Sequence, residues 1–223
     1  MAAHGNKFQE VAAPKIRELF VPSPLILTRV PVEDASEPSD PELVERARGG
    51  EREAFGFLYR RHQASVYQFA RAMTGSPAVA EDVVQEVFLA LLRDLDRYDA
   101  TRAALRTYLF GIARNLARYK ARSVRRLISL DQAEEAVGRD DPSAAIASNE
   151  DMRHLRQCLR GLPSPYREVI ILCDLQELDY AEAAVVLQVP IGTVRSRLHR
   201  GRQLLVERLR RRDGVSVVKR CLV

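Results

Sequence analysis

The side chains best suited to chemistry gather in one basic stretch near the C-terminus, GTVRSRLHRGRQLLVERLRRR (192–212), with eight arginines and one carboxylate. If the stretch is helical, an apolar side suited to packing is formed by Val194, Leu198, Gly201 and Leu205. The polar side carries Arg195, Ser196, His199, Arg200 and Arg202. Guanidinium and hydroxyl groups on one helical face are suited to phosphate oxygens and to base edges in a DNA groove.

A capped helix and a tight turn precede this basic helix. Asp179 and Glu182 have the spacing of a capping box for the segment YAEAAVVL (180–187), and QVPI (188–191) forms a short turn. Helix, short turn and basic helix are the layout of a helix-turn-helix, whose second helix reads DNA with its N-terminal turns. A solvated basic surface would explain the charges but not the capped helix and turn before them. We therefore predict that 192–212 reads a groove.

A second basic stretch, RTYLFGIARNLARYKARSVRR (106–126), has seven Lys and Arg residues and no carboxylate. Tyr108, Phe110 and Tyr119 interleave with these cations, a combination that suits the phosphates and stacked bases of an unpaired strand. The alternative is an ordinary helix with core aromatics and solvated cations. We favour that alternative for Phe110 and leave both interpretations open for Tyr108.

The stretch before it, AEDVVQEVFLALLRDLDRYD (80–99), has the opposite charge, with six carboxylates and two arginines. On the side of this helix away from its apolar positions lie Asp82, Gln85, Glu86 and Leu89. Salt bridges to the basic helix would explain the acids. An exposed leucine among them is more typical of a protein-docking face, which we predict here.

The residues that could support catalysis or metal binding are sparse. A DNA-processing enzyme would need a nucleophile or paired metal-binding carboxylates, and the sequence has no such constellation. His154 and Cys158 share a helical face and could begin a zinc site, but no further Cys or His follows at ligand spacing. We expect this pair to pack, and we expect no cofactor, no metal and no enzymatic activity.

The composition favours a soluble cytoplasmic protein. Three cysteines without a CxxC motif do not form the pattern of a disulfide framework. The N-terminus has no apolar signal segment, and no run is long enough to cross a membrane. The net charge is only +5, so the segregation of charge along the chain says more about partners than the total does.

Helical periodicity dominates the chain from residue 40 onward, and no alternating strand pattern occurs. One apolar stripe contains Phe55, Leu58, Tyr59, His62, Val66, Phe69 and Met73. The next two contain Val84, Val87, Phe88, Leu91 and Leu92, and then Leu105, Leu109, Ile112 and Leu116. Helix starts are predicted where an N-cap side chain precedes proline, at Asp40-Pro41, Ser76-Pro77 and Ser164-Pro165. The predicted fold is all-α.

Two small helical domains are expected. Six of the eleven prolines lie within the first 41 residues, so 1–39 is predicted to be a flexible extension. A first domain spans 40–126, a flexible acidic linker 127–145, and a second domain with the helix-turn-helix 146–212. A C-terminal tail follows at 213–223.

The chain resembles the bacterial RNA polymerase sigma factors of the extracytoplasmic-function (ECF) group, which keep only sigma domains two and four. The resemblance covers about 43–124 and 150–210 and rests on GEREAFGFLYRRHQASVYQFARAMTGSPAVAEDVVQEVFLALL, YLFGIARNLARYKAR and LPSPYREVIILCDLQELDYAEAAVVLQVPIGTVRSRLHRGRQLL. It implies a factor that binds polymerase core, directs it to promoter DNA and promotes strand opening. It also implies an anti-sigma factor as a partner.

The resemblance assigns roles to individual residues. Docking on the β′ coiled coil of the polymerase core, whose β subunit is a further expected contact, falls to Asp82, Gln85, Glu86 and Leu89. Recognition and melting of the minus-ten element fall to the loop 98–105 and to Tyr98, Arg106, Tyr108, Arg114, Asn115, Arg118 and Lys120. Duplex reading of the minus-thirty-five element falls to Thr193, Arg195, Ser196, Arg197, His199 and Arg200.

Three positions depart from the family pattern. Tyr108 stands where the family usually has Trp, and Gly111 interrupts a helix at a cost of up to about 1 kcal/mol. Gln188 replaces a frequent glycine, so we expect a strained backbone there. The alternative function, a stand-alone regulator that binds operators as a dimer, would need a dimerisation or ligand-sensing domain, which residues 40–124 do not resemble.

Overall fold

The computed structural model describes residues 38–130 and 148–212, and within these ranges the backbone is helical without a strand. The predicted all-α fold is therefore confirmed. The predicted extension before residue 38, the predicted linker from residue 131 to 145 and the predicted tail 213–223 lie outside the described residues.

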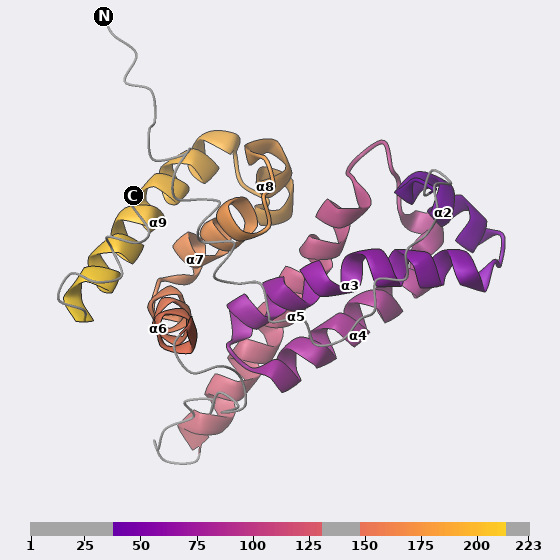
Figure 1. Cartoon of the computed structure of the whole chain (residues 1–223). Helices are drawn as coiled ribbons and strands as arrows, with labels where there is room; N and C mark the ends of the chain where they lie inside the picture. Colours follow the sequence, from indigo (N-terminus) through magenta and orange to yellow (C-terminus); the bar gives the residue numbers. More distant parts are fainter. Residues whose placement is uncertain (1–37, 131–147, 213–223) are drawn as a thin grey trace, which may run out of the picture.

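The first domain is a bundle in which α3, α4 and α5 pack side by side (Figure 1). Its elements are α2 (Asp40–Arg48), α3 (Arg52–Thr74), α4 (Pro77–Arg93), the 3₁₀ helix η1 (Leu95–Arg97) and α5 (Leu105–Leu130). Fully buried Phe69 and Phe110 join α3 to α5, with ring centroids 5.3 Å apart. Such aromatic pairs bury a large apolar area and hold the bundle together. Helix α5 extends past the predicted domain end at residue 126.

The second domain places the basic helix on the outside of a small helical cluster. Its elements are α6 (Ser148–Arg160), α7 (Ser164–Ile170), the π-helix η2 (Ile171–Leu175), α8 (Tyr180–Leu187) and α9 (Ile191–Arg212). Helix α9, drawn in yellow in Figure 1, packs on α6, α7 and α8 and lies on the side away from α2, α3 and α4. One face of α9 is therefore left open to solvent.

The helix starts in the first domain follow the predicted chemistry only in part. Ser76 caps α4 as predicted, accepting a backbone N–H at 3.4 Å. The cap of α2 is Ser39, so the prediction for Asp40 is wrong. The Asp40 carboxylate lies 2.8 Å from His62 and 2.7 Å from Arg61 instead. Burial raises the pKa of Asp40, but the hydrogen bonds from His62 and Arg61 outweigh it and hold the pKa below its ordinary value.

The predicted cap of α7 is also wrong. The N-cap position is Pro163, which offers no side-chain acceptor, and Ser164 is the first residue of the helix. One turn further on, the same helix places Glu168, and the Ser164 hydroxyl donates to its carboxylate at 2.5 Å. The serine therefore supports a buried acid.

The helix-turn-helix has the predicted local geometry. The Asp179 side chain accepts the Glu182 N–H at 2.8 Å, and the Asp179 N–H donates to the Glu182 carboxylate at 3.0 Å, so the capping box is confirmed. Gln188 ends α8 with φ 56° and ψ 46°. This is the left-handed region that favours glycine, which confirms the predicted strain.

After the turn, α9 packs against α7, and the two helices approach closely at Gly201. A Cβ atom there would lie 3.0 Å from Ile170 and 3.2 Å from the Tyr166 carbonyl oxygen. Glycine therefore allows the close approach of the two helices. The predicted apolar side of α9 is confirmed, because Val194, Leu198, Gly201 and Leu205 are all buried.

The two domains touch directly. Helix α5 packs on α8, and α3 contacts both α6 and η2. The basic helix of the first domain thus has a second-domain helix along one side.

Candidate nucleic-acid interface

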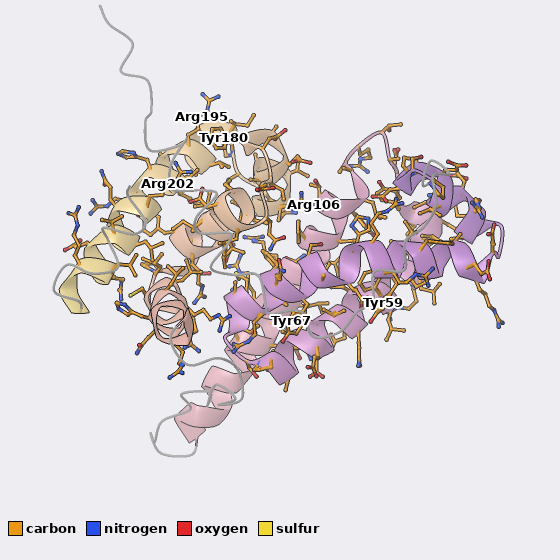
Figure 2. The ribbon with its side chains drawn as sticks, viewed as in Figure 1. Tyr59, Tyr67, Arg106, Tyr180, Arg195 and Arg202 are labelled. Atoms are coloured by element: carbon orange, nitrogen blue, oxygen red, sulfur yellow. The ribbon has the colours of Figure 1, made fainter. Side chains whose placement is uncertain are left out.

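The outer face of α9 presents the predicted duplex-reading residues to solvent. Exposed positions are Arg195, Ser196, His199 and Arg200, while Thr193 and Arg197 are half-buried. Arg195 stands with its guanidinium over the Tyr180 ring, 5.7 Å from the centroid, at the outer edge of the domain (Figure 2). Gln203 lies 3.0 Å from His199 and accepts from Arg200 at 3.3 Å. The four exposed side chains, those of Arg195, Ser196, His199 and Arg200, therefore lie on one accessible face of α9.

Arg202, which the helical wheel placed on this polar side, is turned inward. Its guanidinium donates two hydrogen bonds to Asp174 of η2, at 3.1 and 2.5 Å, and Asp174 is 2% exposed. Burial lowers the pKa of Arg202, but the bond to Asp174 outweighs it and the pKa is raised. Arg202 therefore positions α9 on the domain. A lone carboxylate in the apolar run VIILCDL (169–175) was the signal for this partner.

Helix α5 holds most of its predicted DNA-binding cations in contacts within the protein. Arg106 lies at the junction of the two domains (Figure 2), where it donates to the Gln176 carbonyl oxygen. Arg114 is buried and bonds to Glu168 at 2.6 Å, and Arg118 lies 3.8 Å from the same carboxylate. Asn115, by contrast, is exposed.

Lys120 links α5 to the acidic helix α4. Its ammonium lies 2.8 Å from Glu86 and 3.5 Å from Asp82, and the hydrogen bond to Glu86 raises its pKa. The predicted docking acids and a predicted DNA-binding lysine are therefore brought together. Both acids keep exposed surface, so the salt bridges do not remove them from the outer face.

The exposed face of α4 that the sequence predicts to dock on a protein contains one more apolar residue than expected. Asp82, Gln85 and Leu89 are exposed and Glu86 is half-buried. Leu92, predicted to be in the core stripe, is 54% exposed beside Leu89, which is 57% exposed, so that prediction is wrong. The reason is that Leu91 already fills the inward position, and the next residue turns outward along the helix. The Leu89–Leu92 spacing was the missed signal.

Hydrogen bonds from Tyr98 and Arg48 hold the loop between η1 and α5 in place. Tyr98 is buried and donates through its hydroxyl to the Ala103 carbonyl oxygen at 3.0 Å. Arg48 of α2, which the sequence did not single out, donates to the carbonyl oxygens of Leu95 and Tyr98. The loop tip, residues 99–102, remains exposed.

The aromatic residues of α5 divide between core and surface. Phe110 is fully buried, as we favoured from the sequence. Tyr108 is half-buried, with its ring 5.3 Å from that of Tyr98. Burial raises the pKa of both tyrosines. Tyr119 is 70% exposed, so its ring is accessible from solvent.

Helix α6 carries His154 and Cys158, and η2 carries Cys173. Cys158 Sγ is 3.3 Å from His154 Nε2. Within the described residues, no group of three or more His, Cys, Asp or Glu side chains is arranged to hold a metal ion. Burial raises the pKa of Cys173 to about 12, so its thiol stays protonated at neutral pH.

The matched families agree with the two domains. Sigma-70 region 2 matches residues 58–127, and Sigma-70, region 4 matches residues 152–205. Together with the helical fold and its outward basic helix, these matches define a sigma factor with domains two and four. No helix in the described part of the chain is both long and apolar enough to span a membrane.

Similarity to individual proteins narrows the class. The chain is 31% identical over 180 residues to the ECF RNA polymerase sigma factor SigW of Bacillus subtilis strain 168, covering 75% of this chain and 95% of the relative. The chain therefore belongs to the ECF RNA polymerase sigma factors, which are transcription initiation factors rather than enzymes. This supports a function in initiation and not that of a stand-alone regulator.

Two solved structures have the same architecture. CnrH, solved in complex with the cytosolic domain of CnrY, is 29% identical with a TM-score of 0.62 and covers 79% of this chain and 100% of its own. The sigma factor RpoE, solved in complex with the anti-sigma factor NepR from Bartonella quintana, is 25% identical with a TM-score of 0.56. The match covers 68% of this chain and 93% of the RpoE chain.

Proposed function

We propose that this chain docks on RNA polymerase core through α4, reads the minus-thirty-five duplex with α9 and opens the minus-ten element with α5 and the loop 98–105. The observation that carries the proposal is the outward face of α9, where Arg195, Ser196, His199 and Arg200 lie together on a helix anchored from behind. Side chains on such a face reach base edges and phosphates without a change in the domain.

The docking role of α4 rests on its mixed surface. Leu89 and Leu92 form an exposed apolar pair flanked by Asp82 and Gln85. Apolar anchors ringed by polar groups are typical of protein interfaces rather than of solvated helices. A basic coiled-coil surface with an apolar seam would complement it, which is the chemistry we assign to the β′ partner.

Strand opening is assigned to α5 and the preceding loop. Arg106, Arg114, Arg118 and Lys120 supply cations for the backbone, and Tyr98, Tyr108 and Asn115 complete the predicted minus-ten set. Cations along a strand together with aromatic faces supply binding energy to unpaired bases. In this structure the loop tip 99–102 and Asn115 are exposed, and Arg118 and Lys120 are half-buried.

An anti-sigma factor is the further partner that we propose. The RpoE relative is itself described as bound to an anti-sigma factor. A protein that covers α4, the helix we propose for docking, would keep this chain from polymerase.

Charge reversal on α4 tests the docking role. Asp82→Lys with Glu86→Lys should abolish binding to purified core polymerase in a pulldown. Both side chains reach solvent, and lysines in their place would repel the basic surface that we assign to the partner. Helicity by circular dichroism should be unchanged. The matched control places the same reversal at Glu42 and Glu53, exposed acids of α2 and α3, and should keep core binding. Unchanged affinity of the α4 variant for core would remove the docking assignment.

A further inference from the structure

A pocket rich in arginine lies beside the turn between α6 and α7, where α6 meets the C-terminal end of α3 (Figure 1). Its volume is about 440 Å³, which is that of a small-molecule site rather than of a single ion. Among the described residues that line it there are four arginines and no carboxylate. These are Arg118 and Arg122 of α5, Arg160 of α6 and Arg167 of α7, called the arginine pocket below.

Contacts with the backbone position the two arginines of the second domain. Arg167 donates to the Arg160 carbonyl oxygen at 3.0 Å. The Arg160 side chain lies against Gly75, which ends α3, and a Cβ atom at residue 75 would be 2.6 Å from Arg160 Cδ. Glycine at this place therefore leaves room for the arginine. Side chains that are positioned in advance lower the entropic cost of binding a ligand.

The balance of charge around the pocket is positive. Arg208 of α9 adds a further guanidinium beside it, since a Cβ atom on the lining residue Gly161 would lie 2.5 Å from Arg208 Nη1. One carboxylate comes close, that of Glu168, which is 3.8 Å from Arg118 and already bonded to Arg114 at 2.6 Å. Cations gathered around a concave surface attract anions from solution.

The remaining wall of the pocket suits an uncharged portion of a ligand. Met73 of α3, Ala117 of α5, and Leu162 and Pro163 of the turn line it with apolar side chains. An apolar wall together with a few convergent charged groups is the usual composition of a small-molecule site. The lining therefore indicates a ligand that combines several negative charges with a less polar body.

We propose that the arginine pocket binds a compact polyphosphate, with the phosphate oxygens on the guanidinium groups. A guanidinium presents planar N–H donors that match phosphate oxygens, and it keeps its charge at any physiological pH. Linked phosphates suit the site because four arginines converge on a space larger than one anion needs. Nucleoside triphosphates and inorganic polyphosphate share this chemistry. Since the walls come from both domains, the ligand would connect α5 with the turn between α6 and α7.

The site does not depend on the proposed promoter contacts. Arg118 belongs to the proposed minus-ten set, but Arg122, Arg160 and Arg167 belong to neither of the proposed DNA-binding sets. A failure of the promoter assignments would leave these three arginines in the same place around the same pocket.

Calorimetric titration of the full-length chain tests the proposal, with ATP, inorganic tripolyphosphate and orthophosphate as separate probes. A salt concentration of about 0.15 M screens weak binding to exposed cations. ATP and tripolyphosphate should bind with one molecule per chain, and orthophosphate should bind at least tenfold more weakly, by about 1.4 kcal/mol. Tighter binding of ATP would identify a nucleotide as the ligand, and equal affinity would identify the phosphate chain alone.

Substitutions in the pocket assign the binding to it. Arg122→Gln with Arg160→Gln should weaken ATP binding about tenfold or more, because charge-assisted hydrogen bonds are lost. Arg122 is exposed, so Arg122→Glu alone tests the site without removing a buried contact, and it should weaken binding as well. The matched control, Arg60→Gln with Arg93→Gln, changes the net charge equally at exposed positions of α3 and α4 and should keep the wild-type affinity.

Four results would overturn the proposal. The first is the absence of binding by ATP and tripolyphosphate at about 1 mM. The second is an equal loss of affinity in the control variant, which would show binding to surface charge in general. The third is orthophosphate binding as tightly as ATP. The fourth is a short single-stranded DNA that loses affinity in the pocket variant while ATP does not bind, which would assign these arginines to nucleic acid.

Discussion

Helices α5 and α9 are both rich in arginine, and both carry predicted DNA-binding residues. The exposure of these residues differs between the two helices. On α9 the predicted reading residues Arg195, Ser196, His199 and Arg200 are exposed. On α5 the Arg114 side chain is buried against the other domain. Equal charge density in the sequence therefore does not mean equal availability to DNA.

The difference follows from the location of each helix's carboxylate partner. Arg202 of α9 is paired with Asp174 in its own domain, which fixes the helix and leaves its outer face free. Arg114 of α5 is paired with Glu168 across the junction. One ion pair leaves the predicted reading surface of α9 exposed, and the other covers part of the predicted minus-ten stretch of α5. The same chemistry supports opposite consequences because one pair is local and the other joins two domains.

The largest effect is expected from breaking the local pair. Asp174→Asn leaves the partly buried Arg202 without its carboxylate and should destabilise the second domain by about 3 kcal/mol. Urea unfolding followed by circular dichroism measures the change. The control Asp94→Asn, from an exposed pair with Arg97, should stay within about 0.5 kcal/mol. A loss below about 1 kcal/mol for Asp174→Asn would show that the pair does not anchor α9.

A smaller effect is expected from removing a reading residue of α9. Arg200→Ala should lose about 1–3 kcal/mol of duplex binding and relax preference at one base pair, if Arg200 pairs with a guanine edge. The loss should be the same in the free chain and in the holoenzyme, because this face is already exposed in the structure of the chain alone. Competition among duplexes that differ at single positions measures it. A uniform loss over all sequences would make Arg200 a phosphate contact.

The smallest effect is expected from Lys120, whose pair with Glu86 is partly exposed. Lys120→Met should cost less than about 1 kcal/mol in urea unfolding at neutral pH. The hydrogen bond to Glu86 raises the folded pKa above 10.5, so the stabilisation is fully present below pH 10.5. It is lost as the pH rises through the folded pKa. The gap between variant and wild type should therefore close at high pH, and a gap that widens would contradict the assignment.

Features set by neighbours in sequence could be predicted. The capping box of Asp179 and Glu182 and the strained Gln188 depend on contacts within one turn, and both occur as expected. The apolar side of α9 follows from helical geometry in the same way. These local rules identify a helix-turn-helix before any tertiary contact is known.

Features set by distant partners could not be predicted. Arg114 and Glu168 are 54 positions apart, and nothing in either segment indicates that they meet. The cap predicted at Asp40 fails because its partner His62, 22 positions away, becomes available only in the packed fold. The cap predicted at Ser164 fails for a local reason, since the helix begins at Ser164 itself and Pro163 takes the N-cap position. The apolar stripe predicts that Leu92 is buried, because the stripe does not reveal which of the adjacent residues Leu91 and Leu92 faces inward.

The central claim is that α5 and its loop open promoter DNA. Replacing the loop 98–105 with Gly and Ser residues, in the reconstituted holoenzyme, tests it on a promoter that this holoenzyme selects. Permanganate reactivity of unpaired thymines is the measurement. The account predicts a sharp fall in reactivity on the closed duplex, unchanged binding to core, and partial rescue on a template with a pre-melted bubble, since unpairing is the costly step. Wild-type permanganate reactivity in the loop variant would contradict it.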